Sequence, residues 1–238
     1  MKKILLLTVI LCFAIILSGC ISQNSTSNNN LGQNQKNQTS INKYVIDQSD
    51  FIEGDELIRD IPKSQLNEEE IAGLILMREE EKLARDVYNV LGDKWGTKIF
   101  TNIAQSEQTH MNAIKILLDR YNIEDPIKND AEGAFTSPEL DALYKALVKQ
   151  GQNSLLNALI VGVTIEDLDI KDLNELLTET NKADIIVTYN NLNKGSRNHL
   201  RAYMRQVENN NGTYSPQYIS QTEFDNIISS ASEKGRIE

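Results

Sequence analysis

One pair of side chains with the spacing of a metal site stands in the segment Glu107-Gln108-Thr109-His110. Residues three apart on an α-helix share a face, so the carboxylate of Glu107 and the imidazole of His110 would lean toward one point. Carboxylate and imidazole ligands together suit iron or manganese. A Glu-x-x-His pair projecting into a helical bundle is a recurrent way to hold such ions. This pair therefore indicates a metal site between helices.

Further acids and the second histidine fall at positions that a shared site would need. Glu81 lies seven residues after Leu74 and seven before Tyr88, so it belongs to their apolar helix face. A carboxylate buried alone is costly, and it must pair or bind a cation. Two more helices would contribute Glu166 and Asp169, which are three apart, and His199.

Each of these residues also has an ordinary explanation when it is taken singly. Glu81 would be a solvated member of the acidic run 79–81, and His199 a core histidine satisfied by a neighbour. Glu166 and Asp169 would be acids at a helix end. The chain has only two histidines, however, and each falls on an expected helix. Together they favour one metal site with the ligands Glu81, Glu107, His110, Glu166, Asp169 and His199.

The elements that must position these residues are predicted to be helices. Asn67 is a suitable N-cap for the first, with three glutamates in the first turn, and Gly92 is a suitable stop. Asp169 or Asp172 is expected to cap a break in the third long element. No alternating strand pattern occurs, so an all-α bundle with one longer crossover is expected. The predicted ranges are 67–91, 94 or 97 to 121, 137–149, 153–180, 182–208 and a weak stretch at 221–234.

Charge and cysteine content restrict the class of protein. The formal net charge of −10 argues against a nucleic-acid partner, because no basic cluster neutralises phosphates. Both cysteines, Cys12 and Cys20, lie near the N-terminus, so the remaining chain has neither a disulfide nor a thiolate metal site.

The first twenty residues have the pattern of a lipoprotein signal peptide. Lys2 and Lys3 precede an apolar stretch, 4–16, that is short for a membrane span. It ends in Leu-Ser-Gly-Cys at 17–20. We expect cleavage after residue 19, lipidation of Cys20 and an extracytoplasmic protein anchored to the cell membrane. An ordinary signal peptide or an uncleaved anchor helix are the alternatives.

The rest of the chain divides by composition. Residues 20–45 are rich in Asn, Ser and Gln and are expected to form a flexible tether behind the lipidated cysteine. Residues 46–66 are a lead-in segment, 67–208 the helical bundle, and 209–238 a C-terminal extension.

Sequence motifs in four of the expected helices resemble the ferritin-like superfamily, and rubrerythrin in particular. Glu81-x-x-Ala84-Arg85-x-x-Tyr88 is similar to the ligand motif of the first rubrerythrin helix, and Glu107-x-x-His110 to that of the second. Glu166-x-x-Asp169 and His199 resemble the motifs of the third and fourth helices. Over residues 67–208 the segments 77–88, 102–111 and 195–203 resemble a ferritin-like family of domains of unknown function, number 2202.

The resemblance implies a ferritin-like four-helix bundle with a short extra helix in its crossover and a C-terminal extension. It implies non-haem iron, one ion or two, with manganese as the alternative. Tyr88 and Tyr203 would be hydrogen-bond partners of the ligands. Ser196 stands where the fourth helix of rubrerythrin has a glutamate, which puts the second iron position in doubt. Arg85, Arg197 and Arg201 would pair with buried acids or serve as surface charge.

Redox or peroxide chemistry outside the membrane is the expected function. No cysteines are present for an electron-donating rubredoxin domain, so an external electron donor would be required. A homodimer is a further expectation from the resemblance. The alternatives are a non-catalytic metal-binding lipoprotein and a metal-free structural bundle in which the histidines bond to buried acids.

Overall fold

The computed structural model describes residues 58–235 and residue 237. The predicted signal peptide, Cys20 and the tether at 20–45 lie outside the described residues. Within the described part of the chain there is no strand, and none of its helices combines the length and apolar character needed to cross a membrane. The helices are α3 (Glu68–Trp95), α4 (Lys98–Tyr121), α5 (Pro138–Gly151), α6 (Leu155–Glu179), α7 (Ala183–Asn209) and α8 (Gln221–Ser229).

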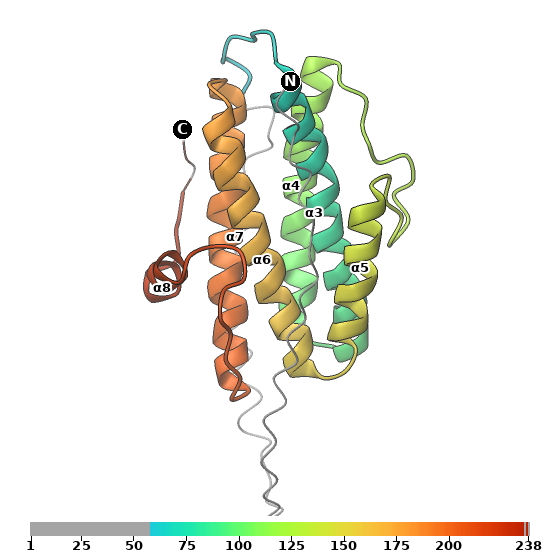
Figure 1. The fold of residues 1–238 in the computed structure, drawn as a ribbon, viewed down its shortest axis with the longest axis vertical. Helices are drawn as coiled ribbons and strands as arrows, with labels where there is room; N and C mark the ends of the chain where they lie inside the picture. The colour runs from blue at the N-terminus through green and yellow to red at the C-terminus, as the bar shows by residue number, and fades with distance from the viewer. Residues whose placement is uncertain (1–57, 236, 238) are drawn as a thin grey trace, which may run out of the picture.

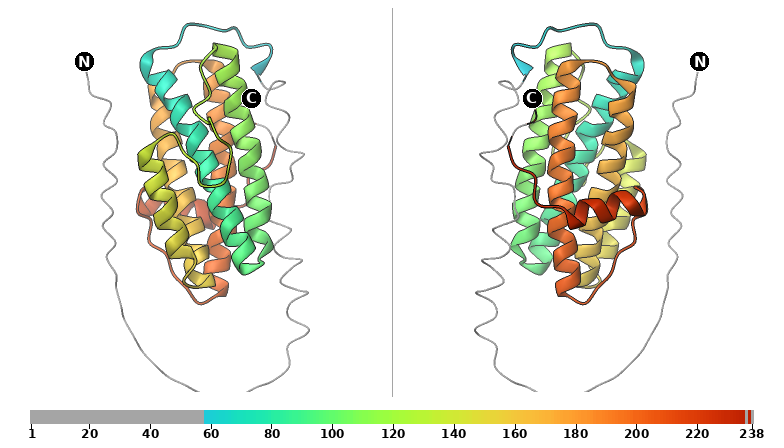
Figure 2. Two further views of the ribbon diagram at one scale, coloured as in Figure 1. Left: turned by 90° about the vertical axis from the view of Figure 1, so that its right-hand side faces the viewer. Right: turned by 90° about the vertical axis from the view of Figure 1, so that its left-hand side faces the viewer.

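The four long helices form a closed ring in which α3 and α7 each pack against both α4 and α6. Helices α3 and α4 are antiparallel, and so are α6 and α7 (Figure 1). Between the two pairs, a loop and α5 return the chain along the outside of α3, so that α6 runs in the same direction as α4 (Figure 2). The predicted all-α bundle is therefore confirmed, with its short helix in the crossover and its extension after α7.

Helix α3 begins as predicted but continues past its predicted end. The Asn67 side chain accepts from the Glu70 backbone N–H at 2.7 Å, and Glu70 accepts in return from Asn67 N–H at 2.9 Å. The stop is Gly96, at φ 64°, and not Gly92. Gly92 lies inside the helix because its missing side chain permits close approach to α4: a Cβ there would lie 3.2 Å from Thr101 Cγ2.

Helix α6 is continuous, so the predicted break near Asp169 is wrong. The helix is capped at its start by Ser154, whose hydroxyl accepts from Asn157 N–H at 3.1 Å. Asp169 and Asp172 have helical neighbours on both sides. Their carboxylates bond to Ser196 and Lys171 and not to backbone N–H groups, which removes the reason to expect a new cap. The predicted last helix, 221–234, was also too long, because α8 ends at Ser229.

The bundle core consists of two apolar clusters with a polar layer between them. One cluster includes Val87, Phe100 and Leu200, and the other includes Leu74 and Leu117. Along α3, α4 and α7, the acid and histidine residues predicted as ligands fall between the residues of the two clusters. On α6, Glu166 and Asp169 lie near the end of the first cluster, before Leu173 of the second. The polar layer is thus covered by hydrocarbon at both ends, and water has little access to it.

Candidate metal centre

All six predicted ligands are buried in the polar layer, contributed by all four long helices. Glu81 comes from α3, and Glu107 and His110 come from α4. The side-chain environment is nearly dry, since His110 is 0% and Glu166 1% exposed. The explanation of Glu81 as a solvated residue fails, because it is also 1% exposed. Asp169, on α6, is the most accessible of the set at 8%.

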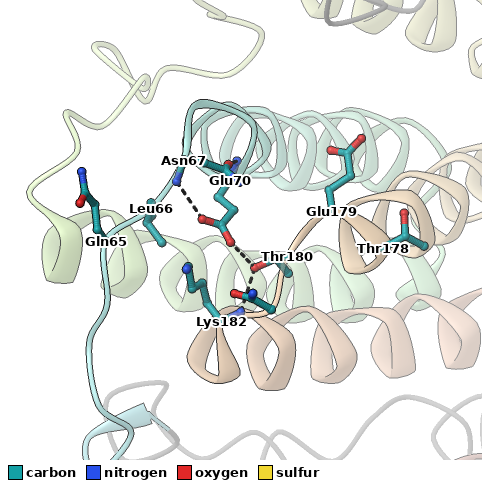
Figure 3. A pocket seen from close by; sticks show the side chains of 9 residues that line it. Gln65, Leu66, Asn67, Glu70, Thr178, Glu179, Thr180 and Lys182 are labelled. Atoms are coloured by element: carbon teal, nitrogen blue, oxygen red, sulfur yellow. Dashed lines mark hydrogen bonds between the residues drawn. The ribbon is translucent and has the colours of Figure 1, made fainter. Parts of the chain in front are cut away.

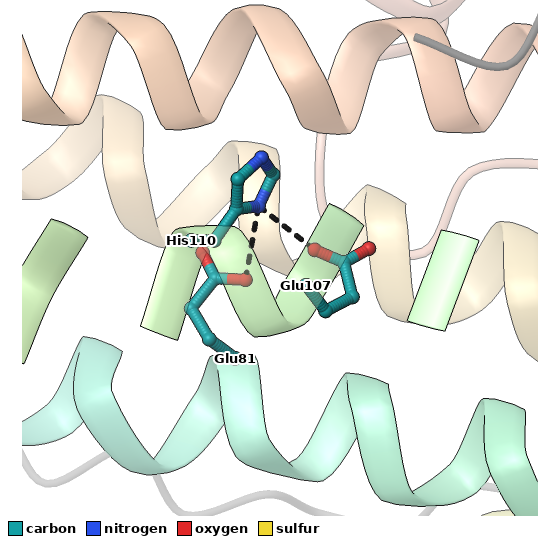
Figure 4. Close-up of side chains that lie close together, drawn as sticks. All are labelled: Glu81, Glu107 and His110. Carbon is teal, nitrogen blue, oxygen red and sulfur yellow. Dashed lines mark hydrogen bonds and ion pairs between the residues drawn. The ribbon is translucent and has the colours of Figure 1, made fainter. Parts of the chain in front are cut away.

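Glu81, Glu107 and His110 form a first compact group, drawn in Figure 4. The imidazole Nδ1 of His110 lies 3.2 Å from Glu81 Oε2 and 2.8 Å from Glu107 Oε2. The two carboxylates approach from different helices, and one ring nitrogen faces both. One atom from each residue can be chosen so that all three lie within 4.8 Å of one another.

Glu107, Glu166 and His199 form a second group of the same kind. Nδ1 of His199 lies 2.9 Å from Glu107 Oε1 and 3.4 Å from Glu166 Oε2. Glu107 therefore belongs to both groups, with one carboxylate oxygen directed to each histidine. The rings of His110 and His199 are stacked with centroids 5.6 Å apart. Each group can hold a metal ion, and Glu107 would be shared.

Three buried polar atoms of this layer, two carboxylate oxygens and one imidazole nitrogen, lack a hydrogen bond of good geometry. The atoms are Glu81 Oε1, Glu107 Oε1 and His199 Nδ1, and the last two lie 2.9 Å apart, where they form an ion pair if the ring is protonated. Buried polar atoms without partners are rare and costly in folded proteins. A metal ion can bind such atoms through their lone pairs, and it does not need the alignment that a hydrogen bond requires. The donor set of carboxylates and imidazoles therefore fits iron or manganese.

In the polar layer, the carboxylates stabilise the protonated histidines, and the histidines stabilise the ionised carboxylates. Burial alone would lower the pKa of His199, but Glu107 and Glu166 outweigh it and raise that pKa to about 10. Burial raises the pKa of Glu81 to about 7 against the pull of His110. Burial works against ionisation of Glu107 as well, yet His199 and His110 hold its pKa below the usual range. Without metal, protons on the imidazoles supply the positive charge that a cation would bring.

Asp169 lies beside the two groups and belongs to neither. Its carboxylate bonds to the hydroxyl of Ser196 on α7, which also reaches the Leu192 carbonyl oxygen at 3.1 Å. Burial, followed by the charges of Glu81 and Glu166, raises the pKa of Asp169 well above its usual range. The serine at the position of the expected glutamate thus holds an acid from the neighbouring helix.

Two tyrosines predicted as partners of the ligands lie at one side of the layer. The Tyr88 hydroxyl donates to Glu166 Oε1 at 2.5 Å. The ring of Tyr203 packs on that of Tyr88 with centroids 5.2 Å apart. Its close approach to α6 requires Gly162, where a Cβ would lie 2.6 Å from the ring. Tyr88 therefore orients a ligand directly. No hydrogen bond joins the Tyr203 hydroxyl to a ligand, contrary to the prediction, and Tyr203 supports Tyr88 by packing.

The sequence reasoning missed Ser106, which contacts the far side of the His199 ring. Its hydroxyl lies 3.1 Å from Nε2, so it fixes the ring with Nδ1 directed toward Glu107. A signal existed in the spacing, because Ser106 lies seven residues after the buried Ile99 and seven before the buried Ala113.

Other buried charges on α3 hold the crossover loop. The ammonium of Lys82 contacts Asp86 and donates to the Ala131 carbonyl at 2.9 Å, and Asp86 accepts from Gly133 N–H at 2.9 Å. Arg85 lies 2.8 Å from the buried Asp86 and also bonds to Asp130, an arrangement that fits the predicted pairing with a buried acid. These charged neighbours of Glu81 are therefore structural.

A surface hollow of about 590 Å³ lies at one end of the bundle, away from the polar layer (Figure 3). One of its two acids, Glu70, already accepts from Asn67 N–H at 2.9 Å and from the Thr180 hydroxyl at 2.8 Å. The hollow therefore lies where the start of α3 contacts the turn between α6 and α7. Its lining is Gln65, Leu66, Asn67, Glu70, Thr178, Glu179, Thr180, Asn181 and Lys182.

Comparison with known proteins gives a family and one homologue of known structure. The sequence model of the family described as "Uncharacterized protein domain (DUF2202)" matches residues 70–231. The uncharacterized protein MJ0754 of Methanocaldococcus jannaschii is 56% identical over 180 residues, which are 76% of this chain and 97% of that protein. The crystal structure of hypothetical protein MJ0754 superimposes with a TM-score of 0.72 at 56% identity, covering 73% of this chain and 99% of that one.

Proposed function

The chain belongs to the family of the uncharacterised domain DUF2202, and we propose that it is a ferritin-like metalloprotein that binds one or two non-haem iron ions. The two groups Glu81–Glu107–His110 and Glu107–Glu166–His199 would hold the ions, with manganese as the alternative metal. The fold supports the ferritin-like assignment, because that class has two antiparallel helix pairs joined by one long crossover.

One observation carries this proposal: Glu107 faces both histidines with its two oxygens. The distances are 2.8 Å to His110 and 2.9 Å to His199, inside a layer from which water is excluded. An ordinary ion pair does not require one carboxylate to face two histidines. A purely structural hydrogen-bond network would leave fewer carboxylate oxygens and imidazole nitrogens without hydrogen bonds. Two adjacent cation positions that share a carboxylate explain both features.

Bound iron would supply one-electron redox chemistry, and the residues around it would control access and protons. The hydrocarbon clusters on either side of the layer exclude bulk water from it. Tyr88 holds Glu166 by its hydroxyl proton, and Ser106 fixes His199. Asp169 stands next to the groups, and the Ser196 hydroxyl keeps its carboxyl in place. We propose that Asp169 occupies the role left by the missing fourth-helix glutamate.

We place the protein outside the cytoplasm, attached to the cell membrane by lipid on Cys20. This proposal rests on the sequence pattern of residues 1–20 and on the tether that follows it. An external electron donor would then be required for turnover, since the chain has no cysteine beyond Cys20 to hold a donor centre. Homodimer formation is proposed on the ferritin-like resemblance alone.

The activity proposed is oxidation of two bound ferrous ions by one hydrogen peroxide, which takes up two protons and leaves as two water molecules. Protein purified without added metal and without a tag is analysed for its elements and for its optical spectrum. After anaerobic loading with ferrous iron, peroxide should produce the ferric absorption within the mixing time. Iron that binds but reacts with peroxide no faster than free ferrous iron would refute the redox function and leave metal binding intact.

A non-catalytic metal-binding protein is the second candidate. Two observations favour this second function. Ser196 provides no carboxylate from α7, and the carboxylate of Asp169 already accepts a hydrogen bond from the Ser196 hydroxyl. The peroxide experiment separates it from the first candidate, and an absence of bound metal would reject both.

A further inference from the structure

The outer side of α7 carries a row of side chains that all bind the C-terminal segment, residues 230–237, of which 236 is not described. The row follows one helix face, because its members are three or four residues apart. The segment leaves α8 and runs along α7 (Figures 1 and 2). Its residue numbers rise as those on the helix fall, so the two are antiparallel. The contacts are Arg201 with Ser230, Asn198 with Glu233, Lys194 with Gly235 and Asn191 with Ile237.

Two asparagines of this row bind backbone in the way that a neighbouring strand would. Asn198 Nδ2 donates to the Glu233 carbonyl at 3.0 Å, and the Glu233 N–H donates to Asn198 Oδ1 at 2.9 Å. Asn191 repeats the pattern on Ile237, with distances of 2.9 Å and 3.1 Å. A side-chain amide has the donor and acceptor of a peptide group, so both asparagines recognise an extended chain by its backbone.

The carboxylate of Glu233 is recognised separately by two arginines. Arg197 Nε lies 2.8 Å from Oε1, and Arg201 Nη2 lies 2.9 Å from the same oxygen. Both guanidinium groups are fixed in advance by α7 itself, Arg197 on Asn193 at 2.9 Å and Arg201 on Asn198 at 2.7 Å. Prior fixation lowers the entropy lost when a carboxylate binds.

The C-terminal segment is held by polar groups, and the core does not include it. None of its described residues belongs to either apolar cluster. Asn191 and Asn198 are only 3% and 2% exposed, so the segment covers amides that would otherwise need water. A segment bound in this way can leave and return without opening the hydrophobic core.

We propose that this face of α7 is a binding site for an extended peptide with one acidic side chain, and that its resident ligand is the chain's own C-terminal segment. Recognition comes from two backbone positions four residues apart and one carboxylate. The site is separate from the metal centre, because the side chains of Asn191 and Asn198 bond to the outer segment and no side-chain hydrogen bond joins either of them to a predicted ligand.

The substitution Glu233→Pro in the full chain tests the site, because it removes both the N–H and the carboxylate that α7 recognises. A synthetic peptide of residues 230–238 is then titrated into this variant, and the side-chain amide NMR signals of Asn191 and Asn198 are followed. The native peptide should bind with a dissociation constant below about 1 mM and shift both signals. The unaltered chain should bind it at least about tenfold more weakly, since its own segment competes at an effective concentration in the millimolar range.

Matched variants make each outcome decisive. A peptide with proline at position 233 should not bind, whereas a peptide with Lys234→Gln should bind within about twofold, because Lys234 is exposed. Adding Asn198→Asp to the chain should abolish binding, since it places an acceptor against the Glu233 carbonyl. Native peptide binding no tighter than the proline peptide would overturn the proposal. Loss of helical structure in Glu233→Pro would also overturn it, by showing that the segment is a required part of the fold.

Discussion

Glu107 Oε1 lies 2.9 Å from Nδ1 of His199 although the residues belong to different helices and are 92 positions apart in the sequence. The other oxygen of the same carboxylate lies 2.8 Å from His110. Glu107 is thus the one side chain common to both groups of candidate ligands. Four helices must keep their axial positions for this arrangement to exist.

Replacing the shared carboxylate should affect both positions at once. Glu107→Gln removes the charge and one acceptor while keeping the shape, so bound iron per chain should fall at least about tenfold. Elemental analysis after equilibrium dialysis gives the readout. Glu208→Gln is the matched control, because Glu208 is exposed near the end of α7. Equal iron content in the two variants would exclude Glu107 as a ligand.

Ser106→Ala should weaken metal binding without removing any ligand. The hydroxyl lies 3.1 Å from Nε2 of His199 and fixes the ring, and loss of such partners typically reduces metal affinity about 10–100-fold. Competition with a chelator measures the change, with Thr109→Ala on the same helix as the control. If both variants release metal to the same chelator concentration, Ser106 has only a packing role.

Gly162→Ala should destabilise the bundle by about 1–3 kcal/mol, as overpacking of a filled core does. The added Cβ would lie 2.6 Å from the Tyr203 ring, which is fully buried. Chemical denaturation of the metal-free protein gives the free energy of unfolding. The cost should be largely relieved in a Tyr203→Leu background, where the ring is absent. Strictly additive effects of the two changes would show that the ring is not what Gly162 accommodates.

Acid should release the C-terminal segment. Partial burial works against ionisation of Glu233, but Arg197 and Arg201 outweigh it and hold its pKa below the usual range. A lowered folded-state pKa means that stabilisation is complete above the ordinary glutamate pKa of about 4.3 and is lost as pH falls through the lower folded value. Hydrogen exchange at the Glu233 and Ile237 amides should therefore lose protection only in that acidic range.

Glu233→Gln is the control for this pH dependence. The glutamine has no charge to lose, so its segment should be less protected at neutral pH and show no further loss over the same acidic range. An identical pH profile in the variant and the parent would assign the change to another titrating group.

The inner face of each helix could be predicted from spacing, because a period of seven places Glu81 with Leu74 and Tyr88 whatever surrounds the helix. Capping chemistry placed Asn67 correctly for the same local reason. The prediction that α3 ends at Gly92 is wrong, because the sequence does not distinguish a glycine that ends a helix from one that permits close approach of another helix. The unbroken α6 was missed because the partners of Asp169 and Asp172 depend on the tertiary fold.

Contacts between distant segments were beyond sequence reasoning. Asn198 and Glu233 recognise each other across the turn and helix that follow α7, and no local pattern marks the pair. In the segment Ser-Arg-Asn-His, 196–199, only the inward residues were assigned in detail. The structure shows that Arg197 and Asn198 serve the opposite side of the same helix.

X-ray diffraction at the iron absorption edge, on crystals loaded anaerobically with ferrous iron, tests the metal centre most directly. Anomalous density is predicted among Glu81, Glu107 and His110, among Glu107, Glu166 and His199, or in both positions. Ordered crystals without anomalous density at either position, with His110 still hydrogen-bonded to Glu81, would contradict the account.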